Sequence, residues 1–287
     1  MLSRLAPDLA ARVAEGMFFR VPRHRRPGAE TALLAGAEAR PMRVGRRRVE
    51  TWRWGLGPSV LLVHGWGGRG AQLGAFVPPL VASGFSVVTF DAPGHGASDA
   101  GPVTIPETVA AIREVAAARG RLAGLVAHSL GATAASRALY EGLDVGAAIF
   151  ISPVAELGDP AARFTEALGF SRVHERMRQR IERRVGMPWS AFDVTALAPA
   201  LSAPLLVVHD LGDAEVAWQH GRVVARAWPG GQLLLTDGLG HRRILRDPDV
   251  VAATVAYLGA RTAERGVTAA AAADGGRATP IEVLMAG

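Results

Sequence analysis

The chain has 287 residues, of which 49% are hydrophobic and 20% charged, and this composition excludes wholesale disorder. Its length suits one large α/β domain with a buried core, or two small domains. The chain contains no Cys, which excludes disulfides, thiolate metal sites and cysteine nucleophiles. The formal net charge is +6, but 26 acidic residues are interleaved with the Arg residues and no nucleic-acid-reading motif accompanies the charge. We therefore expect no nucleic-acid partner.

The sequence also gives no sign of a membrane segment. The N-terminus meets a charge at Arg4 and a proline at Pro7, too early for the apolar core of a signal peptide. The longest uncharged window, residues 71–90, is about as long as a spanning helix. Prolines at 78–79 and a Ser-Gly pair at 83–84 divide that window into helix, turn and strand. These observations predict a cytoplasmic protein with no membrane partner.

Residues 1–39 are predicted to form an N-terminal helical extension. An apolar side chain recurs at every fourth position, which predicts an amphipathic helix with these residues on one face: Leu5, Leu9, Val13 and Met17. An Arg-rich loop follows over residues 20–26, and a second short helix is expected around residues 29–39.

From residue 40 onwards the pattern becomes an alternation of strands and helices. Strands are expected at residues 41–44, 49–54, 60–63, 86–90, 122–127, 147–151, 205–209 and 232–236. Helices are expected at residues 71–83, 105–119, 130–141, 214–227 and 247–261. This alternation predicts one α/β domain over residues 40–262, with a mostly parallel eight-stranded sheet covered by helices on both faces. The Ala/Gly-rich end, residues 263–287, has little periodicity and is expected to be a disordered tail.

One connection in this domain, residues 153–203, is too long for a simple crossover. It has a helical pattern whose apolar residues form one stripe: Val173, Met177, Ile181 and Val185. The Arg side chains of this segment lie off the stripe. An insertion at this point lies above the carboxyl ends of the strands, where ligands bind, so we interpret it as a helical cap. We expect Val173, Met177 and Ile181 to roof an apolar pocket for substrate. The alternative is that the stripe packs only on other cap helices.

The strongest chemical signal is a serine at a sharp turn between strand and helix. An apolar strand ends in Ala127-His128-Ser129-Leu130-Gly131 and a small-residue helix follows at once. Such a turn, a nucleophile elbow, presents the hydroxyl above the sheet and needs small side chains on either side. The usual G-x-S-x-G pattern has Ala127 at its first position, where a methyl group is still small.

Three further motifs each follow another predicted strand. His64-Gly65-Trp66-Gly67-Gly68 follows an early core strand, His209-Asp210-Leu211-Gly212-Asp213 a later one, and Gly238-Leu239-Gly240-His241 the last. Together with the serine turn, these motifs place a Ser, an Asp and a His, in that order along the chain, each after the end of a strand. Over residues 40–261 the sequence therefore resembles the α/β-hydrolase superfamily, in particular the small capped bacterial serine esterases.

The resemblance implies a role for each motif. Ser129 would be the nucleophile, His241 its general base and Asp213 the acid that orients the imidazole. Asp210 is the competing acid, and Glu156 occupies an alternative position used in some relatives. Backbone amides of Trp66 and Leu130 would form the oxyanion hole. The other motif histidines are expected to make structural hydrogen bonds rather than bind a metal: His64, His95, His128 and His209.

The predicted activity is cofactor-free and metal-free hydrolysis of a small-molecule carboxylic ester with a small apolar acyl group, through an acyl-Ser129 intermediate. A thioesterase would share every one of these residues, and the short motifs also resemble those of esterases acting on carrier-bound methyl esters. An alternative of another class is a catalytically silent hydrolase fold used for binding, which the complete Ser, Asp and His set disfavours. A hydrolase with a nucleophilic Asp is disfavoured because serine occupies the elbow.

Overall fold

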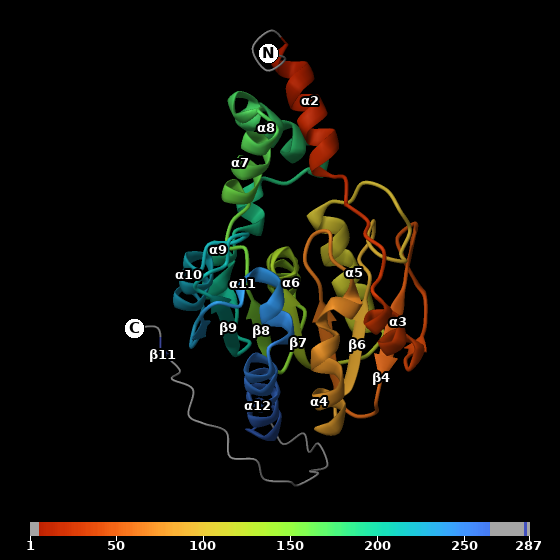
Figure 1. Ribbon diagram of the computed structural model, residues 1–287. Coiled ribbons are helices and arrows are strands. Elements are labelled where there is room, and N and C mark those ends of the chain that lie inside the picture. Colours follow the sequence, from red (N-terminus) through yellow and green to blue (C-terminus); the bar gives the residue numbers. More distant parts are fainter. Residues whose placement is uncertain (1–5, 265–283, 286–287) are drawn as a thin grey trace.

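A computed structural model describes residues 6–264 and 284–285 of the chain. Its centre is a twisted sheet, with helices on both sides and a group of helices at one end (Figure 1). The strands of this sheet are, in chain order, β1 (Glu38–Ala39), β4 (Thr51–Trp54), β5 (Ser59–Val63), β6 (Ser86–Phe90), β7 (Leu122–His128), β8 (Ala148–Ile151), β9 (Leu205–Asp210), β10 (Gln232–Thr236) and β11 (Leu284–Met285). Their order in space is β1-β4-β6-β5-β7-β8-β9-β10-β11.

The sheet is parallel from β6 to β10, and only its outer pairs, β1–β4, β4–β6 and β10–β11, are antiparallel. The expected mostly parallel α/β sheet is therefore confirmed. Among the described residues it has nine strands, because two-residue strands pair at both edges. The segment expected as the first strand forms β2 (Met42–Val44), which pairs with β3 (Arg47–Val49) in a separate two-stranded sheet.

Helices flank the sheet as α3 (Gly28–Ala35), α4 (Val77–Ala82), α5 (Ile105–Ala117), α6 (Leu130–Tyr140), α10 (Gln219–Ala227), α11 (Gly240–Arg243) and α12 (Pro248–Glu264). Short 3₁₀ turns η1 (Gly70–Phe76) and η5 (Ile244–Arg246) precede α4 and α12. The last two residues of α12 lie in the segment expected as a disordered tail, residues 263–287. The rest of that segment, except β11, lies outside the described residues.

Alternation along the strands explains why both faces of the sheet are covered. Leu61 of β5 belongs to the same apolar layer as Ile112 of α5, whereas its neighbour Leu62 belongs to the layer on the opposite face, with Leu80 of α4 and Leu258 of α12. All of these side chains are fully buried. A strand with two buried faces reads as a continuous apolar run, which is the pattern seen in the sequence. The core is thus two apolar layers, one on each side of the sheet.

The connection between β8 and β9 forms the predicted group of additional helices. Its elements are α7 (Gly158–Ala167), η2 (Ser171–Val173), α8 (His174–Val185), η3 (Trp189–Phe192), α9 (Val194–Leu197) and η4 (Ala198–Ala200). The N-terminal helix α2 (Pro7–Phe18) lies beside α8 at the top of Figure 1, far along the chain but adjacent in space. We use the word cap for α2, α7, η2, α8 and η3 together.

The face by which α2 packs differs from the face expected from its sequence. Leu9, Val13 and Met17 are 53%, 38% and 40% exposed, and Leu5 lies outside the described residues. The buried face carries small side chains instead, at Ala10, Ala11 and Ala14. The alanines let α2 approach closely, so that the large side chains filling the interface come from the partner segment, which includes Val173, Met177 and Ile181.

An ion pair supports this contact between α2 and α8. Glu15 is buried on α2 and accepts a hydrogen bond of 2.7 Å from Arg180 Nε, while Arg184 lies 3.5 Å from its other carboxylate oxygen. The Arg184 guanidinium also lies over the Phe19 ring, 4.9 Å from its centre.

Among the described helices, none is both long and apolar enough to cross a membrane.

Candidate active site

Ser129 stands at the turn between β7 and α6 with a backbone conformation that L-amino acids rarely adopt. Its φ is 54° and its ψ is −126°, and its N–H donates to the Ile151 carbonyl at 2.9 Å. This strained corner is the geometry expected of a nucleophile elbow. Two glycines make room for it. A Cβ added at Gly65 would lie 2.9 Å from Ser129 Cβ, and one at Gly131 would lie 2.4 Å from the His64 carbonyl oxygen.

Asp213 and His241 meet across two loops that follow β9 and β10. His241 Nδ1 donates to Asp213 Oδ2 at 2.7 Å, and both side chains are buried. The other carboxylate oxygen of Asp213 accepts the amides of Glu215 and Val216, each at 2.9 Å. Burial opposes ionisation of Asp213, but hydrogen bonds from His209, His241 and the Val216 amide outweigh it and hold its pKa well below the usual range. The carboxylate is therefore charged and fixed against the imidazole.

Asp210, the competing acid, contacts a different part of the same loops. Its side chain is fully buried and accepts the amides of Leu239 and Gly240, each at 2.9 Å, and the Thr236 hydroxyl at 2.8 Å. These hydrogen bonds outweigh the burial that opposes ionisation and lower the pKa of Asp210. Asp210 therefore stabilises the loop that carries His241 through these backbone hydrogen bonds and forms none with the imidazole. Glu156, the other alternative, is exposed.

The loop bearing His241 lies directly against the serine turn. The ring of His128, the residue before Ser129, lies 4.5 Å from the His241 ring, and its Nε2 donates to the His241 carbonyl at 3.0 Å. Burial, with the nearby His241, lowers the pKa of His128 to about 3, so His128 is neutral at pH 7. Within the described chain no direct hydrogen bond joins Ser129 to His241.

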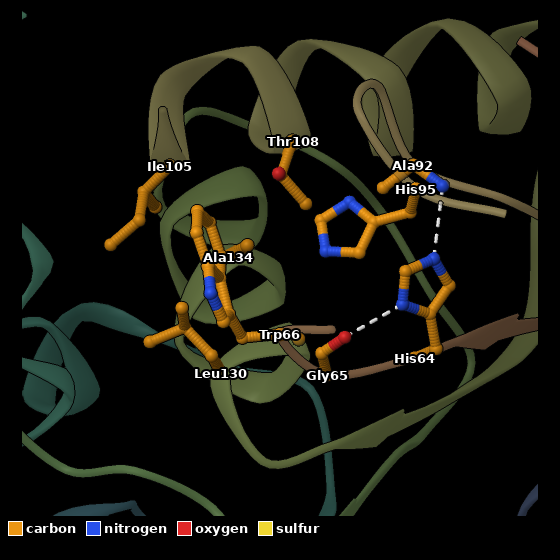
Figure 2. Close-up of a pocket in the computed structure, with 10 residues that line it drawn as sticks. His64, Gly65, Trp66, Ala92, His95, Ile105, Thr108, Leu130 and Ala134 are labelled. Carbon is orange, nitrogen blue, oxygen red and sulfur yellow. Dashed lines mark hydrogen bonds between the residues drawn. The ribbon is translucent and has the colours of Figure 1, made fainter. Parts of the chain in front are cut away.

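The glycine-rich loop after β5 is fastened by two buried histidines. His64 donates through Nδ1 to the Gly65 carbonyl at 2.7 Å and accepts the Ala92 amide at 2.9 Å (Figure 2). His95 accepts the Gly67 amide through Nε2 at 3.1 Å. Burial is the main cause that lowers the pKa of His64 to about 4 and that of His95 to about 3. Both rings are neutral at pH 7, and their hydrogen bonds fix the backbone on either side of Trp66.

Trp66 and Leu130, the two expected oxyanion residues, line the same narrow hollow (Figure 2). The remaining wall is mostly apolar and includes Ile105 of α5 and Ala134 of α6. Among the hydrogen bonds of the described chain, neither the Trp66 nor the Leu130 amide donates to a protein acceptor. Two such amides beside a strained serine can receive a developing negative charge on a substrate oxygen.

The three residues expected to roof the pocket do not line this hollow. Val173 packs on Ala10 and Ala11 of α2, whereas Met177 and Ile181 belong to the buried core of the cap. Ile105 and Leu130, which line the hollow, also pack against this core. The stripe packs on α2, a surface that the sequence did not indicate, and the role of these three residues in substrate binding stays a prediction. Conversely, sequence reasoning missed Ile105 and Ala134, because nothing in a helical pattern marks which apolar residues face a site.

A second serine shares the unusual backbone of Ser129. Ser152 has a φ of 47° at the end of β8 and is completely buried, with no hydrogen-bond partner for its hydroxyl among the described residues. Its amide donates to the Val208 carbonyl at 2.8 Å. Because its hydroxyl is enclosed, it cannot meet a substrate as Ser129 can.

The comparisons with known proteins identify the family of this chain. The sequence model of the alpha/beta hydrolase family matches residues 60–254, which is more than half of the chain. The chain belongs to the alpha/beta hydrolase family. The predicted membership of this superfamily is thereby confirmed. No curated protein matches the sequence significantly.

Solved structures of hydrolases share the fold at low sequence identity. A putative lipase from Acinetobacter baumannii is 16% identical, with a TM-score of 0.63 over 84% of this chain and 99% of its own. A thermophilic esterase from Thermogutta terrifontis is 22% identical, with a TM-score of 0.60 over 78% of this chain and 99% of its own. A thioesterase domain from the curacin biosynthetic pathway is 18% identical, with a TM-score of 0.59 over 77% and 98%. At these identities the likeness establishes the α/β-hydrolase fold.

Proposed function

We propose that this hydrolase is a serine esterase that cleaves a small-molecule carboxylic ester with a small apolar acyl group. The observation that carries the proposal is the 2.7 Å hydrogen bond between His241 Nδ1 and Asp213, on a loop packed against the strained Ser129 turn. The esterase and lipase folds among the structural neighbours support a hydrolase. In this proposal Ser129 is the nucleophile, His241 the general base and Asp213 the orienting acid.

The reaction proceeds in two acyl transfers. Ser129 Oγ attacks the ester carbonyl carbon while its proton passes to His241 Nε2, and Asp213 stabilises the imidazolium that forms. The negative charge on the carbonyl oxygen is received by the amides of Trp66 and Leu130, each worth roughly 3–4 kcal/mol when correctly aimed. The C–O bond to the alcohol then breaks, and the alcohol leaves with the proton from His241. Water repeats the sequence and releases the acid from Ser129.

The hollow beside the oxyanion amides supports the choice of acyl group. Its wall includes the apolar side chains of Trp66, Ile105, Leu130 and Ala134. The polar side chains in the wall are those of His64, His95 and Thr108, and it contains no carboxylate or guanidinium. A charged acyl group would lose its hydration there without a partner, whereas each buried methylene adds about 0.8 kcal/mol until the space is filled. We therefore expect acetate and butyrate esters to be better substrates than dicarboxylate or long-chain esters.

A panel of p-nitrophenyl esters and acyl thioesters of graded chain length tests the proposal. We expect kcat/KM to be highest for short, uncharged acyl esters and Ser129→Ala to reduce it at least 10³-fold. A thioesterase would share every catalytic residue and show the opposite preference for the leaving group, with thioesters turned over faster than esters of the same acyl chain. Turnover that survives Ser129→Ala, or none on either series, would overturn the proposed chemistry.

A further inference from the structure

The loop that carries the Trp66 amide has little stiffness of its own. Its sequence, His64-Gly65-Trp66-Gly67-Gly68, contains three glycines, and Gly67 has a positive φ of 68°. Glycine has the largest freedom to lose on ordering, so such a loop keeps one shape only when its surroundings hold it. An amide that must meet a developing charge loses much of its effect when it is displaced by about 1 Å.

The N-terminal extension contacts this loop directly at Gly67. The exposed Pro22 lies over it, so that a Cβ at Gly67 would be 3.2 Å from Pro22 Cγ. Residues 20–27, which include Pro22, form the strap between α2 and α3. Arg23 of the same strap donates to the Gly96 carbonyl and, at 3.4 Å, to the Ser98 carbonyl. The strap therefore crosses both the glycine-rich loop and the neighbouring loop that carries His95.

A second contact joins the end of the glycine-rich loop to α3 through an ion pair. Arg69 follows Gly68 and is buried, and its guanidinium donates two hydrogen bonds to the carboxylate of Glu30 on α3, one of them at 2.8 Å. A two-point contact between a guanidinium and a carboxylate fixes orientation as well as position. Because Glu30 is largely buried too, its charge is little screened by solvent.

A third contact reaches the next residue through a buried carboxylate. Asp91 is fully buried, and its Oδ1 accepts the Gly70 amide at 2.8 Å. Its Oδ2 accepts the Ala97 amide at 2.7 Å and a guanidinium N–H of Arg26 at 3.1 Å. Arg26 of the strap therefore forms an ion pair with the carboxylate that holds this backbone.

We propose that the N-terminal extension positions the oxyanion loop, with Pro22, Arg26 and Glu30 as positioning residues that act through Gly67, Asp91 and Arg69. The inference rests on the proposed function, because it takes the Trp66 amide to be an oxyanion donor. Since the strap is continuous with α2, which packs on α8 in the cap, one short segment of chain holds both the oxyanion loop and the cap.

Glu30→Gln and Pro22→Gly test the proposal against a matched control, Glu38→Gln. Glu38 lies in the same extension and pairs with Arg53 at the sheet edge, where the contact is exposed and does not involve the loop. The readouts are kcat and KM for p-nitrophenyl butyrate, and the inhibition constant of a trifluoromethyl ketone, whose adduct with Ser129 carries the oxyanion. Backbone hydrogen exchange over residues 64–70 and thermal unfolding complete the set.

We expect Glu30→Gln to lower kcat about 10- to 100-fold, with KM within about twofold of wild type. The inhibitor should weaken by the same factor as kcat, and exchange over residues 64–70 should accelerate at least tenfold, both well below the unfolding temperature. Pro22→Gly, which removes no buried charge, should show the same pattern to a smaller degree, and Glu38→Gln should leave all three quantities unchanged.

Failure of this inference is separable from failure of the proposed function. If Glu30→Gln and Pro22→Gly change kcat, inhibitor affinity and loop exchange no more than Glu38→Gln does, the extension has no positioning role. A loss confined to thermal stability contradicts the proposal in the same way. If wild type shows no Ser129-dependent turnover, the proposed function fails. Hydrogen exchange over residues 64–70 still tests the positioning role in that case: unchanged exchange in Glu30→Gln and Pro22→Gly rejects it, and faster exchange supports it.

Discussion

The core and the cap of this molecule hold their side chains in different ways. In the core, Ser129, Asp213 and His241 each follow the carboxyl end of a parallel strand, and backbone amides hold the two acidic side chains of these loops. In the cap, α2 packs on α8, and an ion pair links the buried Glu15 with the partly exposed Arg180, which are 165 residues apart in the chain.

This difference has a consequence for what each region can do. Backbone hydrogen bonds in tight loops define the position of a carboxylate closely, which suits a group that must orient an imidazole for proton transfer. Apolar side chains packed across two helices hold the helices together but aim no particular atom. We therefore expect substitutions in the core loops to change the rate of reaction, and substitutions within the cap interface to change stability.

The largest effect is expected from the two aspartates of the core. Asp213→Asn should lower kcat about 10⁴-fold, because an amide in place of the carboxylate favours the wrong tautomer of His241. Asp210→Asn should lower kcat far less and should reduce thermal stability, because Asp210 holds the Leu239 and Gly240 amides rather than the imidazole. Steady-state kinetics and thermal unfolding of both variants check this, and a greater loss of kcat at Asp210 would reverse the assignment.

A smaller effect, of a different kind, is expected in the cap. Met177 is fully buried against α2 and its neighbours, so Met177→Ala should cost about 2–5 kcal/mol of unfolding free energy. It should leave the dependence of kcat/KM on acyl chain length unchanged, because Met177 does not line the hollow. The matched variant Ile105→Ala, at the wall of the hollow, should alter that dependence. An altered chain-length profile for Met177→Ala would instead support the acyl-pocket role expected from the sequence.

The smallest effect, counted per pH unit, is a change in the pH dependence of stability. His128 stays neutral in the folded protein because burial lowers its pKa to about 3, whereas in the unfolded chain it titrates near its ordinary value of about 6.5. Between these two values the unfolded chain binds the extra proton, so stability falls as the pH falls, by up to about 1.4 kcal/mol per pH unit. His128→Gln, which keeps a donor toward the His241 carbonyl, should reduce the slope by about one proton. Urea unfolding between pH 4 and 7 measures it, and an unchanged slope would contradict this account.

The comparison also explains how much could be predicted from the sequence. The parallel sheet was predictable because buried strands read as apolar runs, and the Ser129 turn because its small residues lie together in the chain. The sequence also favoured Asp213 over Asp210, and the structure brings Asp213 to His241. Each of these signals is local, within a few residues of the feature it describes.

The cap could not be predicted in the same way, because its partner segments are distant in the chain. Periodicity marks the face of α2 that carries Leu9 and Val13 as apolar, yet close packing with α8 selects the alanine face. Nothing in the sequence indicates that the stripe of α8 meets α2, or that Pro22 and Glu30 reach the loop around Trp66. Such contacts depend on three-dimensional packing between elements, which hydrophobic periodicity does not encode.

The most direct test of the central claim is covalent labelling of the intact protein by a fluorophosphonate. This probe reacts with a serine that a neighbouring base activates, and the adduct mass with peptide mapping identifies the site. We predict stoichiometric labelling at Ser129, none in Ser129→Ala, and a rate lower by several orders of magnitude in His241→Ala. Equal labelling rates for wild type and His241→Ala, or an adduct on any other residue, would contradict the central claim.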